Sequence, residues 1–459
     1  MQGMPASLAR AAAFDILLRV ERESSYASDL LHSKTCQTLS TPDHALATQL
    51  VMGVLRWRSK LDDEIAQASS LPLKKLDLEI LTALRLALYQ FRHLDRIPSR
   101  AALHESVELV KRARKRSAGP FVNAVLRKLS TTLPARPSVA CAVDLDRIDS
   151  PQALAAKMAH PQWLVERWSR GYGLDAAQKI CRHDQSTPTT TIRLRTPEAE
   201  TEARKEGISL APGAFLVSAR RVQSGDITKG EAFRRGNVAI QDEASQLVAA
   251  LVNPDSGQQA RIFDCCAAPG GKTLAIADEN PAASITAVEL RPHRARLMKK
   301  LFAQAHLKTG IEVLVADARH LPVRQQFDRI LADVPCSGTG TLSRNPEIKW
   351  RLKPEDLVEL HHRQLAILRG AMAHVAANGR LIYSTCSLEN EENEDVVEQA
   401  LAENNSFRVL DCRAVLQRIK AQGKLSLPDP IQLTRGPYLR TIPGLHPCDG
   451  FFAAILESA

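Results

Sequence analysis

The chain has 459 residues, of which 44% are hydrophobic and 24% charged, as in a globular protein of several domains at roughly 100–200 residues each. A formal charge of +10 favours an acidic partner such as nucleic acid. Nine cysteines without a CxxC pair exclude a disulfide framework and the usual metal-site spacings, so we expect reduced thiols and no metal. No signal peptide or run of about 18 apolar residues is present, so we expect a cytoplasmic protein without a membrane partner.

The first part of the chain, residues 7–130, shows helical spacing of apolar residues and no strand-like alternation. One helix is predicted over residues 80–91, with an apolar stripe on one face. Another is predicted to begin at Asp43. We therefore expect an all-helical first domain over residues 1–135.

A cationic run, Lys-Arg-Ala-Arg-Lys-Arg at residues 111–116, lies within these predicted helices. The simpler interpretation is a solvated helix end, and the alternative is a patch that contacts phosphate groups. The sequence Gly119-Pro120 is expected to interrupt the helix directly afterwards and leave the cations on an exposed turn. That placement favours a contact with RNA phosphates.

The middle of the chain changes composition twice. Residues 136–155 are rich in Pro, Ala, Ser and Asp, which is typical of a linker. A short helix is predicted around residues 163–168, and the alternation in residues 191–195 predicts a strand. We expect a small α/β domain, similar to an RNA-recognition fold, over residues 156–238, where it would help to position RNA.

From about residue 239 to the end of the chain at residue 459, predicted strands alternate with predicted helices. Such alternation is typical of an open parallel, Rossmann-like sheet with helices on both faces. Ligands bind beyond the carboxyl ends of the strands in these sheets, and every motif below follows a strand end. The predicted strands are residues 261–264, 284–288, 311–315, 328–332 and 380–383, and the longer helices are residues 292–304 and 355–376.

A turn of small residues follows the first predicted strand, with the sequence Cys266-Ala267-Ala268-Pro269-Gly270-Gly271-Lys272-Thr273. Small side chains and two glycines allow the backbone to turn tightly and approach a ligand closely. The spacing matches neither GxGxxG nor GxxxxGK[ST], which disfavours a dinucleotide or a nucleoside triphosphate as the ligand.

Two acidic residues end the next two predicted strands. Glu289 could accept the hydroxyl protons of a ribose, and Asp317 could accept the exocyclic amine of an adenine. Each carboxylate could instead cap the helix that follows it. Together with the glycine turn, the two acids predict an adenosine-containing ligand without a pyrophosphate, and S-adenosylmethionine fits this description.

Two cysteines end the fourth and fifth predicted strands: Cys336 in Asp-Val-Pro-Cys-Ser-Gly and Cys386 in Ser-Thr-Cys-Ser. A free cysteine is usually an inert small hydrophobe, but these two lie among Gly, Ser and Pro where a site is expected. A thiolate that adds to C6 of cytosine makes C5 nucleophilic toward a methyl donor. The carboxyl group of Asp333 could stabilise charge on the ring. The residues alone leave open which thiol attacks, although the analogous DNA reaction uses a Pro-Cys cysteine and would favour Cys336.

These motifs resemble the Sun/Fmu (RsmB-type) small-subunit ribosomal RNA cytosine-C5 methyltransferases. The resemblance extends over nearly the whole chain, because several N-terminal segments are similar to the NusB-type helical RNA-binding domain of that family. Departures are small: Cys265, Val334 and Glu289 stand where Leu, Ala and Asp are common. The matching segments are residues 49–56, 84–90, 121–127, 241–245, 264–273, 333–338, 383–387 and 449–452.

The resemblance implies a methyltransferase that uses S-adenosylmethionine to form 5-methylcytosine in 16S ribosomal RNA through a covalent cysteine–C6 adduct. It implies that Cys386 attacks C6 and that Cys336 assists release of the product, with Asp333 as a third catalytic group. It also implies cofactor contacts from residues 266–272, Glu289, Asp317 and Asp333.

Two alternatives remain open from the sequence. The protein could methylate another RNA such as transfer RNA, which the helical N-terminal domain disfavours. It could also be a non-catalytic RNA-binding or antitermination factor with a degenerate methyltransferase domain, which the intact set Cys336, Cys386 and Asp333 disfavours. No protein partner is indicated.

Overall fold

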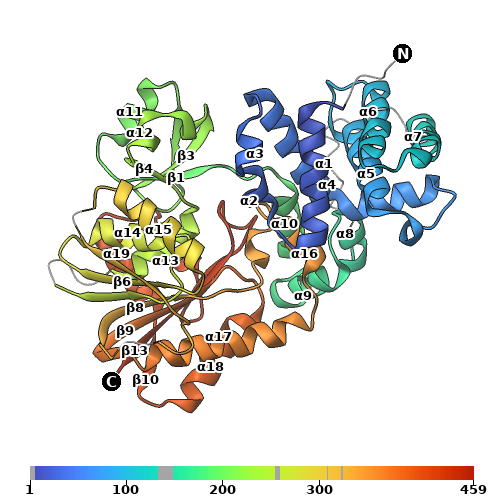
Figure 1. Ribbon diagram of the computed structural model, residues 1–459. Helices are drawn as coiled ribbons and strands as arrows, with labels where there is room; N and C mark the ends of the chain where they lie inside the picture. The colour runs from blue at the N-terminus through green and yellow to red at the C-terminus, as the bar shows by residue number, and fades with distance from the viewer. Residues whose placement is uncertain (1–5, 133–147, 254–258, 308, 322–323) are drawn as a thin grey trace. The chain divides into compact units, whose positions relative to one another are not determined.

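The computed structural model describes residues 6–132, 148–253, 259–307, 309–321 and 324–459 (Figure 1). The chain forms two compact units. The first contains residues 1–187 and 342–351, and the second contains residues 188–341 and 352–459. Among the described helices, none has the length and apolar character that crossing a bilayer would require.

The first unit is helical throughout its described part, which confirms the prediction for residues 7–130. Two short 3₁₀ turns, Leu73–Lys75 and Arg116–Ala118, separate some of the helices. Its helices are α1 (Leu8–Glu23), α2 (Ala27–Leu31), α3 (Lys34–Gln37), α4 (Thr41–Ala68), α5 (Leu78–His93), α6 (Ser99–Arg112), α7 (Gly119–Thr132), α8 (Pro151–Lys157), α9 (Gln162–Tyr172), α10 (Leu174–Gln185) and α16 (Ile348–Arg351).

The helix predicted over residues 80–91 lies within α5, and Ile80, Leu84, Leu88 and Phe91 of its predicted apolar face are buried. Residues on the other sides of α5 are buried as well, which the sequence did not predict. Its polar residues are paired inside the bundle. The Arg85 guanidinium donates to both carboxylate oxygens of Asp62, at 2.6 and 2.7 Å, and Gln90 Oε1 accepts from Arg10 Nε at 2.7 Å. Such pairing removes the cost of burying polar groups, so the helix can occupy the centre of the bundle.

The predicted helix start at Asp43 was wrong by a few residues, because Ser40 caps α4. The Ser40 Oγ atom accepts the Asp43 backbone N–H at 3.3 Å and donates to the Asp43 carboxylate at 2.6 Å. Residues 136–147 of the predicted linker lie outside the described residues, and its last residues contribute to helix α8.

The segment 342–351 belongs to the first unit although the surrounding sequence belongs to the second. Lys349 is buried, and its Nζ atom donates to the Arg56 carbonyl at 3.0 Å. The Trp350 indole N–H donates to the Leu55 carbonyl at 2.5 Å. These bonds to backbone carbonyls fix helix α16 against α4.

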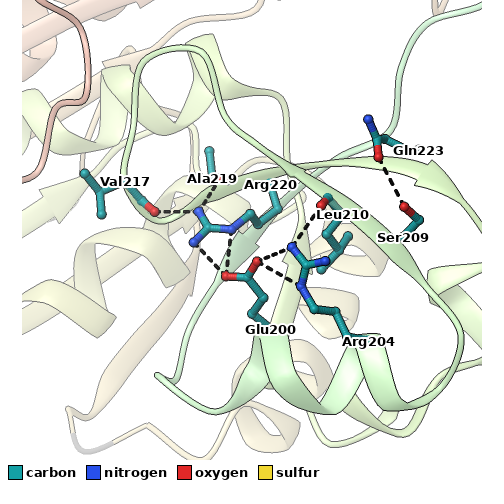
Figure 2. Close-up of polar contacts among 8 residues, drawn as sticks. All are labelled: Glu200, Arg204, Ser209, Leu210, Val217, Ala219, Arg220 and Gln223. Carbon is teal, nitrogen blue, oxygen red and sulfur yellow. Dashed lines mark hydrogen bonds and ion pairs between the residues drawn. The ribbon is translucent and has the colours of Figure 1, made fainter.

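The second unit contains a small antiparallel sheet with strand order β2-β3-β1-β4, in which β1 is the strand that the alternation in residues 191–195 predicted. Glu200 on helix α11 accepts hydrogen bonds from Arg204 and Arg220, as Figure 2 shows, and these bonds lower the pKa of the Glu200 carboxyl to about 2. The ion pair to Arg220 fastens α11 to β3. The elements are β1 (Thr191–Leu194), α11 (Ala199–Lys205), β2 (Ser209–Pro212), β3 (Ala219–Ser224), α12 (Glu231–Arg234) and β4 (Val238–Ile240).

The main sheet of this unit has the order β11-β12-β13-β9-β8-β5-β6-β7, with β10 paired to β13. The five predicted strands are present and parallel, in the order β7-β6-β5-β8-β9. The expectation of a wholly parallel sheet was wrong, because β13 pairs antiparallel with β9, β12 and β10. The strands are β5 (Arg261–Asp264), β6 (Ser284–Glu289), β7 (Ile311–Val315), β8 (Phe327–Asp333), β9 (Val375–Thr385), β10 (Phe407–Leu410), β11 (Thr434–Arg435), β12 (Tyr438–Thr441) and β13 (Phe451–Ser458).

Helices cover both faces of the main sheet (Figure 1). Because side chains alternate along a strand, Ile262 packs with α13, α14 and α19 while its neighbour Phe263 packs with α17 and α18. This two-sided burial fixes the strand register and the positions of the loops at the carboxyl ends. The helices are α13 (Glu243–Val252), α14 (Gly271–Glu279), α15 (Pro292–Gln304), α17 (Asp356–Met372), α18 (Glu394–Glu403) and α19 (Cys412–Ala421).

Candidate active site

The glycine turn connects β5 to α14 and needs glycine at position 270. Gly270 has a φ of +107°, and a Cβ atom there would lie 3.1 Å from the ring of Phe302. Both the left-handed backbone and the close contact therefore favour glycine over any residue with a side chain. The turn presents its backbone at the carboxyl end of the sheet, where the sequence predicted a ligand.

Lys272 and Asp333 join the glycine turn to the two cysteine loops. Lys272 Nζ lies 2.7 Å from Asp333 Oδ2, and the Ser384 hydroxyl donates to Asp333 Oδ1 at 2.8 Å. Burial alone would lower the pKa of Lys272, but Asp333 and Cys386 raise it above its ordinary value. The Lys272 ammonium also lies 4.9 Å from the centre of the Phe451 ring.

Cys336 and Cys386 lie side by side, with their sulfur atoms 3.2 Å apart. The Cys386 backbone N–H donates to the Cys336 sulfur at 3.3 Å. A disulfide bond would be about 2.05 Å long, so these are two separate thiols. Both residues are partly exposed. Two effects raise the pKa of the Cys336 thiol well above its ordinary value. The larger is the hydrogen bond with Cys386, and the second is burial.

Asp264 ends β5 and was not among the predicted site residues. Its Oδ2 atom accepts the Thr273 hydroxyl at 2.7 Å, whereas its buried Oδ1 atom has no hydrogen-bond partner among the described residues. Burial raises the pKa of this carboxyl to about 7. The signal in the sequence was an acid at the end of the first strand, directly before the glycine turn. A buried, unsatisfied carboxylate oxygen fits a cationic ligand group.

Glu289 and Asp317 follow β6 and β7 as predicted, and both carboxylates make local contacts. Glu289 Oε1 accepts the Arg291 backbone N–H at 2.8 Å. Asp317 accepts the backbone N–H of Arg319 at 2.9 Å and its guanidinium at 2.6 Å, which lowers the pKa of the Asp317 carboxyl to about 2. Neither contact is a helix cap: Arg291 is the N-cap of α15, which has no side-chain cap hydrogen bond among the described residues, while residues 318–320 after Asp317 form a turn. Each carboxylate has further lone pairs for a ligand.

The cationic run 111–116 divides into paired and unpaired residues. Three of its cations have carboxylate partners: Lys111 with Glu108, Arg112 with Asp15 and Lys115 with Asp77. Arg114 and Arg116 form no ion pair with any residue in the described part of the chain.

Arg114 has a left-handed backbone, with φ of +62°. The predicted interruption by Gly119-Pro120 was wrong, because these residues begin helix α7 and the turn precedes them. A groove with a volume of about 790 Å³ lies between α6 and α7, and its lining includes Arg100, Lys111, Arg116 and Arg127. Its positive charge suits a polyanion.

Comparison with known families gives three matches along the chain. The model described as 16S rRNA methyltransferase RsmB/F matches residues 249–457. The NusB family matches residues 7–131, and a ferredoxin-like domain of RsmF/B-like methyltransferases matches residues 160–210. These matches confirm the helical, small α/β and methyltransferase parts of the predicted fold.

Relatives with similar length support the same assignment. A probable ribosomal RNA small subunit methyltransferase B of Bacillus subtilis is 36% identical, over 87% of this chain and 89% of its own. The ribosomal RNA small subunit methyltransferase B of Vibrio cholerae is 30% identical, over 98% of this chain and 97% of its own. The solved structure of PH0851 shares the fold with a TM-score of 0.79 at 24% identity, covering 99% of both chains. The chain therefore belongs to the RsmB/F family of 16S rRNA methyltransferases, which are S-adenosylmethionine-dependent enzymes that form 5-methylcytosine.

Proposed function

We propose that this protein methylates C5 of a cytosine in the 16S RNA of the small ribosomal subunit, with Cys386 as the nucleophile. The observation that carries the proposal is the pair of thiols 3.2 Å apart, in loops joined to the glycine turn through Asp333. The names of the Bacillus and Vibrio relatives support the small-subunit RNA as the substrate. We propose the cytoplasm as the protein's place of action.

In the proposed reaction, the electron pair of the Cys386 thiolate forms a bond to C6 of the cytosine, the C5=C6 π bond breaks, and its electron pair moves to C5 and is shared with N3. Asp333 lies at the same strand ends and would stabilise the charge that develops at N3 and the exocyclic amine. S-adenosylmethionine, when bound, supplies the methyl group that C5 receives. A base then removes the C5 proton, the carbon–sulfur bond breaks and Cys386 leaves as a thiolate.

We propose that Cys336 assists this last step, in which the carbon–sulfur bond to Cys386 breaks. Its sulfur atom is 3.2 Å from Cys386 Sγ, so it can accept or donate a proton beside the breaking bond. The raised pKa of the Cys336 thiol makes its thiolate a stronger base than an ordinary cysteine.

The proposed cofactor contacts are the backbone and side chains of residues 266–272, with Glu289 for the ribose, Asp317 for the adenine and Asp333 near the reacting centre. To these we add Asp264, because its unsatisfied Oδ1 atom could accept from the ammonium group of S-adenosylmethionine. No metal takes part in this proposal.

We also propose the division of the chain that its composition suggested: a helical RNA-binding domain at 1–135, a linker at 136–155, an RNA-positioning domain at 156–238 and a catalytic domain at 239–459. Arg114 and Arg116, which have no ion-pair partner among the described residues, and the cationic lining of the groove between α6 and α7 support RNA contact there.

Bisulfite mapping of ribosomal and transfer RNA tests the proposal. Cells that contain the protein should show a 5-methylcytosine in 16S RNA that is missing from cells without it or with the variant Cys386→Ala. A site that depends on the protein in transfer RNA would refute the proposed substrate, and full methylation by Cys386→Ala would refute the nucleophile.

A further inference from the structure

A buried carboxylate, that of Glu392, lies between the two cysteine loops and contacts both. Its Oε1 atom accepts the Ser337 backbone N–H at 2.7 Å, and its Oε2 atom accepts the Ser387 hydroxyl at 2.5 Å. The Ser337 hydroxyl also donates to Oε2. Glu392 has no exposed surface.

Each of these serines directly follows one of the cysteines in the chain, Ser337 after Cys336 and Ser387 after Cys386. The two hydroxyl oxygens lie 3.1 Å apart. One carboxylate therefore ties together the residues next to both thiols, and a shift of Glu392 would move one loop relative to the other.

Glu392 is itself held from two sides. The Gln364 side chain on α17 donates to its Oε1 atom at 2.8 Å, and the Tyr383 hydroxyl on β9 donates to its backbone carbonyl at 2.6 Å. Contacts with both α17 and β9 give the carboxylate a fixed position, so it can serve as a reference point for the two loops.

We propose that Glu392 is a positioning residue that sets the distance between Cys336 and Cys386 and thereby controls release of the methylated RNA. The inference rests on the proposed roles of the two cysteines. Glu392 does not need to touch RNA or cofactor for this role, because it acts through the serines beside the thiols.

Four donors surround the side-chain oxygens of Glu392. Two N–H groups and two hydroxyl groups donate to them, and a carboxylate can accept all four. Glutamine would place a donor where the Ser337 and Ser387 hydroxyls now donate. Ser387 Oγ also accepts the Glu389 backbone N–H at 3.1 Å, which limits how far this hydroxyl can adjust.

The charge has a second consequence for Cys336. Hydrogen bonding with Cys386 and burial raise the pKa of the Cys336 thiol most, and the negative charge of Glu392 raises it further. Removing the charge should lower the pKa of Cys336, so the pH dependence of product release should move to lower pH. A residue with a purely structural role would not produce that shift.

The first test is disulfide formation by the two thiols with diamide. Each thiol loses one hydrogen as the sulfur–sulfur bond forms, and the diamide is reduced to its hydrazine. Mass spectrometry should show rapid formation of the Cys336–Cys386 bond in the unmodified protein. In Glu392→Gln the bond should form about tenfold more slowly, because a tenfold rate difference corresponds to the energy of one hydrogen bond to a charged group. The matched control is Glu359→Gln, whose side chain is 80% exposed, and it should react like the unmodified protein.

The second test follows the RNA reaction with S-adenosylmethionine in a single turnover. In Glu392→Gln, decay of the protein–RNA adduct should slow about tenfold and its pH dependence should move to lower pH, while methyl transfer changes about threefold or less. If Glu392→Gln does not fold, Ser387→Ala removes one of the same hydrogen bonds without disturbing the carboxylate charge, and it should slow both disulfide formation and adduct decay.

Unchanged disulfide formation and adduct decay in a folded Glu392→Gln or Ser387→Ala protein would overturn the inference. That failure is distinct from failure of the proposed function, since the variant Cys386→Ala would still lose all activity. If Cys386→Ala remained active, the proposed function would fail whatever the behaviour of Glu392.

Discussion

The Nζ atom of Lys272 lies 2.7 Å from Oδ2 of Asp333, so the glycine turn and the Pro-Cys loop are held together by a largely buried ion pair. This pair orients the carboxylate that faces the reacting centre in the proposed mechanism. Replacing Lys272 by methionine keeps the length of the side chain but removes the charge.

For Lys272→Met we expect methyl transfer to slow by about 10²-fold, the usual effect of losing one preorganised electrostatic group. The measurement is the initial rate of methyl incorporation into 16S RNA. Lys353→Met, at an exposed position near the start of α17, is the matched control. Equal rates for the two variants would show that the ion pair has no role in the reaction.

Asp264 predicts a pH dependence for cofactor binding. Its carboxyl group has a pKa of about 7, so it is protonated below that pH and ionised above it. Only the ionised form attracts the cationic groups of S-adenosylmethionine, so the affinity should rise by up to about tenfold per pH unit toward pH 7 and then level off.

Calorimetric titration at several pH values measures this affinity. Asp264→Asn should bind S-adenosylmethionine more weakly and without the rise toward pH 7. Asp175→Asn, at a side chain that is 78% exposed, should retain it. A pH-dependent affinity that persists in Asp264→Asn would assign the titration to another group.

The unpaired cations predict how RNA binding responds to salt. Arg114→Ala with Arg116→Ala should weaken binding and reduce the slope of log affinity against log salt by about 0.7–0.9 for each phosphate that the variant no longer neutralises. Arg112→Ala should change the slope less, because Asp15 already neutralises this residue. An unchanged slope in the double variant would show that these arginines lie on a solvated surface and do not contact RNA.

Lys349 predicts a pH dependence of folding stability in the first unit. Burial lowers its pKa to about 7, from 10.5 for an ordinary lysine. Between about pH 7 and 10.5 the unfolded chain therefore binds a proton that the folded chain does not. Because stability rises with pH when the unfolded state binds more protons, the free energy of unfolding should increase across this range, on the order of 3–5 kcal/mol.

The change in the free energy of unfolding can be measured by urea unfolding at about pH 7, 8 and 9, with tryptophan fluorescence as the signal. Lys349→Met should flatten it, and Lys353→Met should leave it unchanged. A rise of equal size in Lys349→Met would exclude Lys349 as its source.

Much of the fold follows from local patterns in the sequence. The bounds of β5 and α15 match the predicted residues 261–264 and 292–304, because the first is a short apolar run before a glycine turn and the second begins at a proline. The antiparallel strands at the end of the chain were missed. Residues 451–456 are all buried, so β13 lacks the alternation of apolar and polar residues that identifies many antiparallel strands.

The candidate site was only partly predictable for a different reason. The two cysteines and Asp333 stand at strand ends, which the topology brings together. Glu392 follows the last of these strands on a short turn, and its role depends on hydrogen bonds from three other segments. Likewise, nothing in the local sequence of residues 342–351 indicates that this segment packs with the helical unit.

The most direct measurement of the central claim is a denaturing gel of Cys336→Ala after incubation with 16S RNA and S-adenosylmethionine. A covalent protein–RNA complex should accumulate, because Cys386 can attack C6 but release is impaired. The complex should vanish in the double variant with Cys386→Ala. A complex that survives in the double variant, or none in Cys336→Ala, would contradict the account.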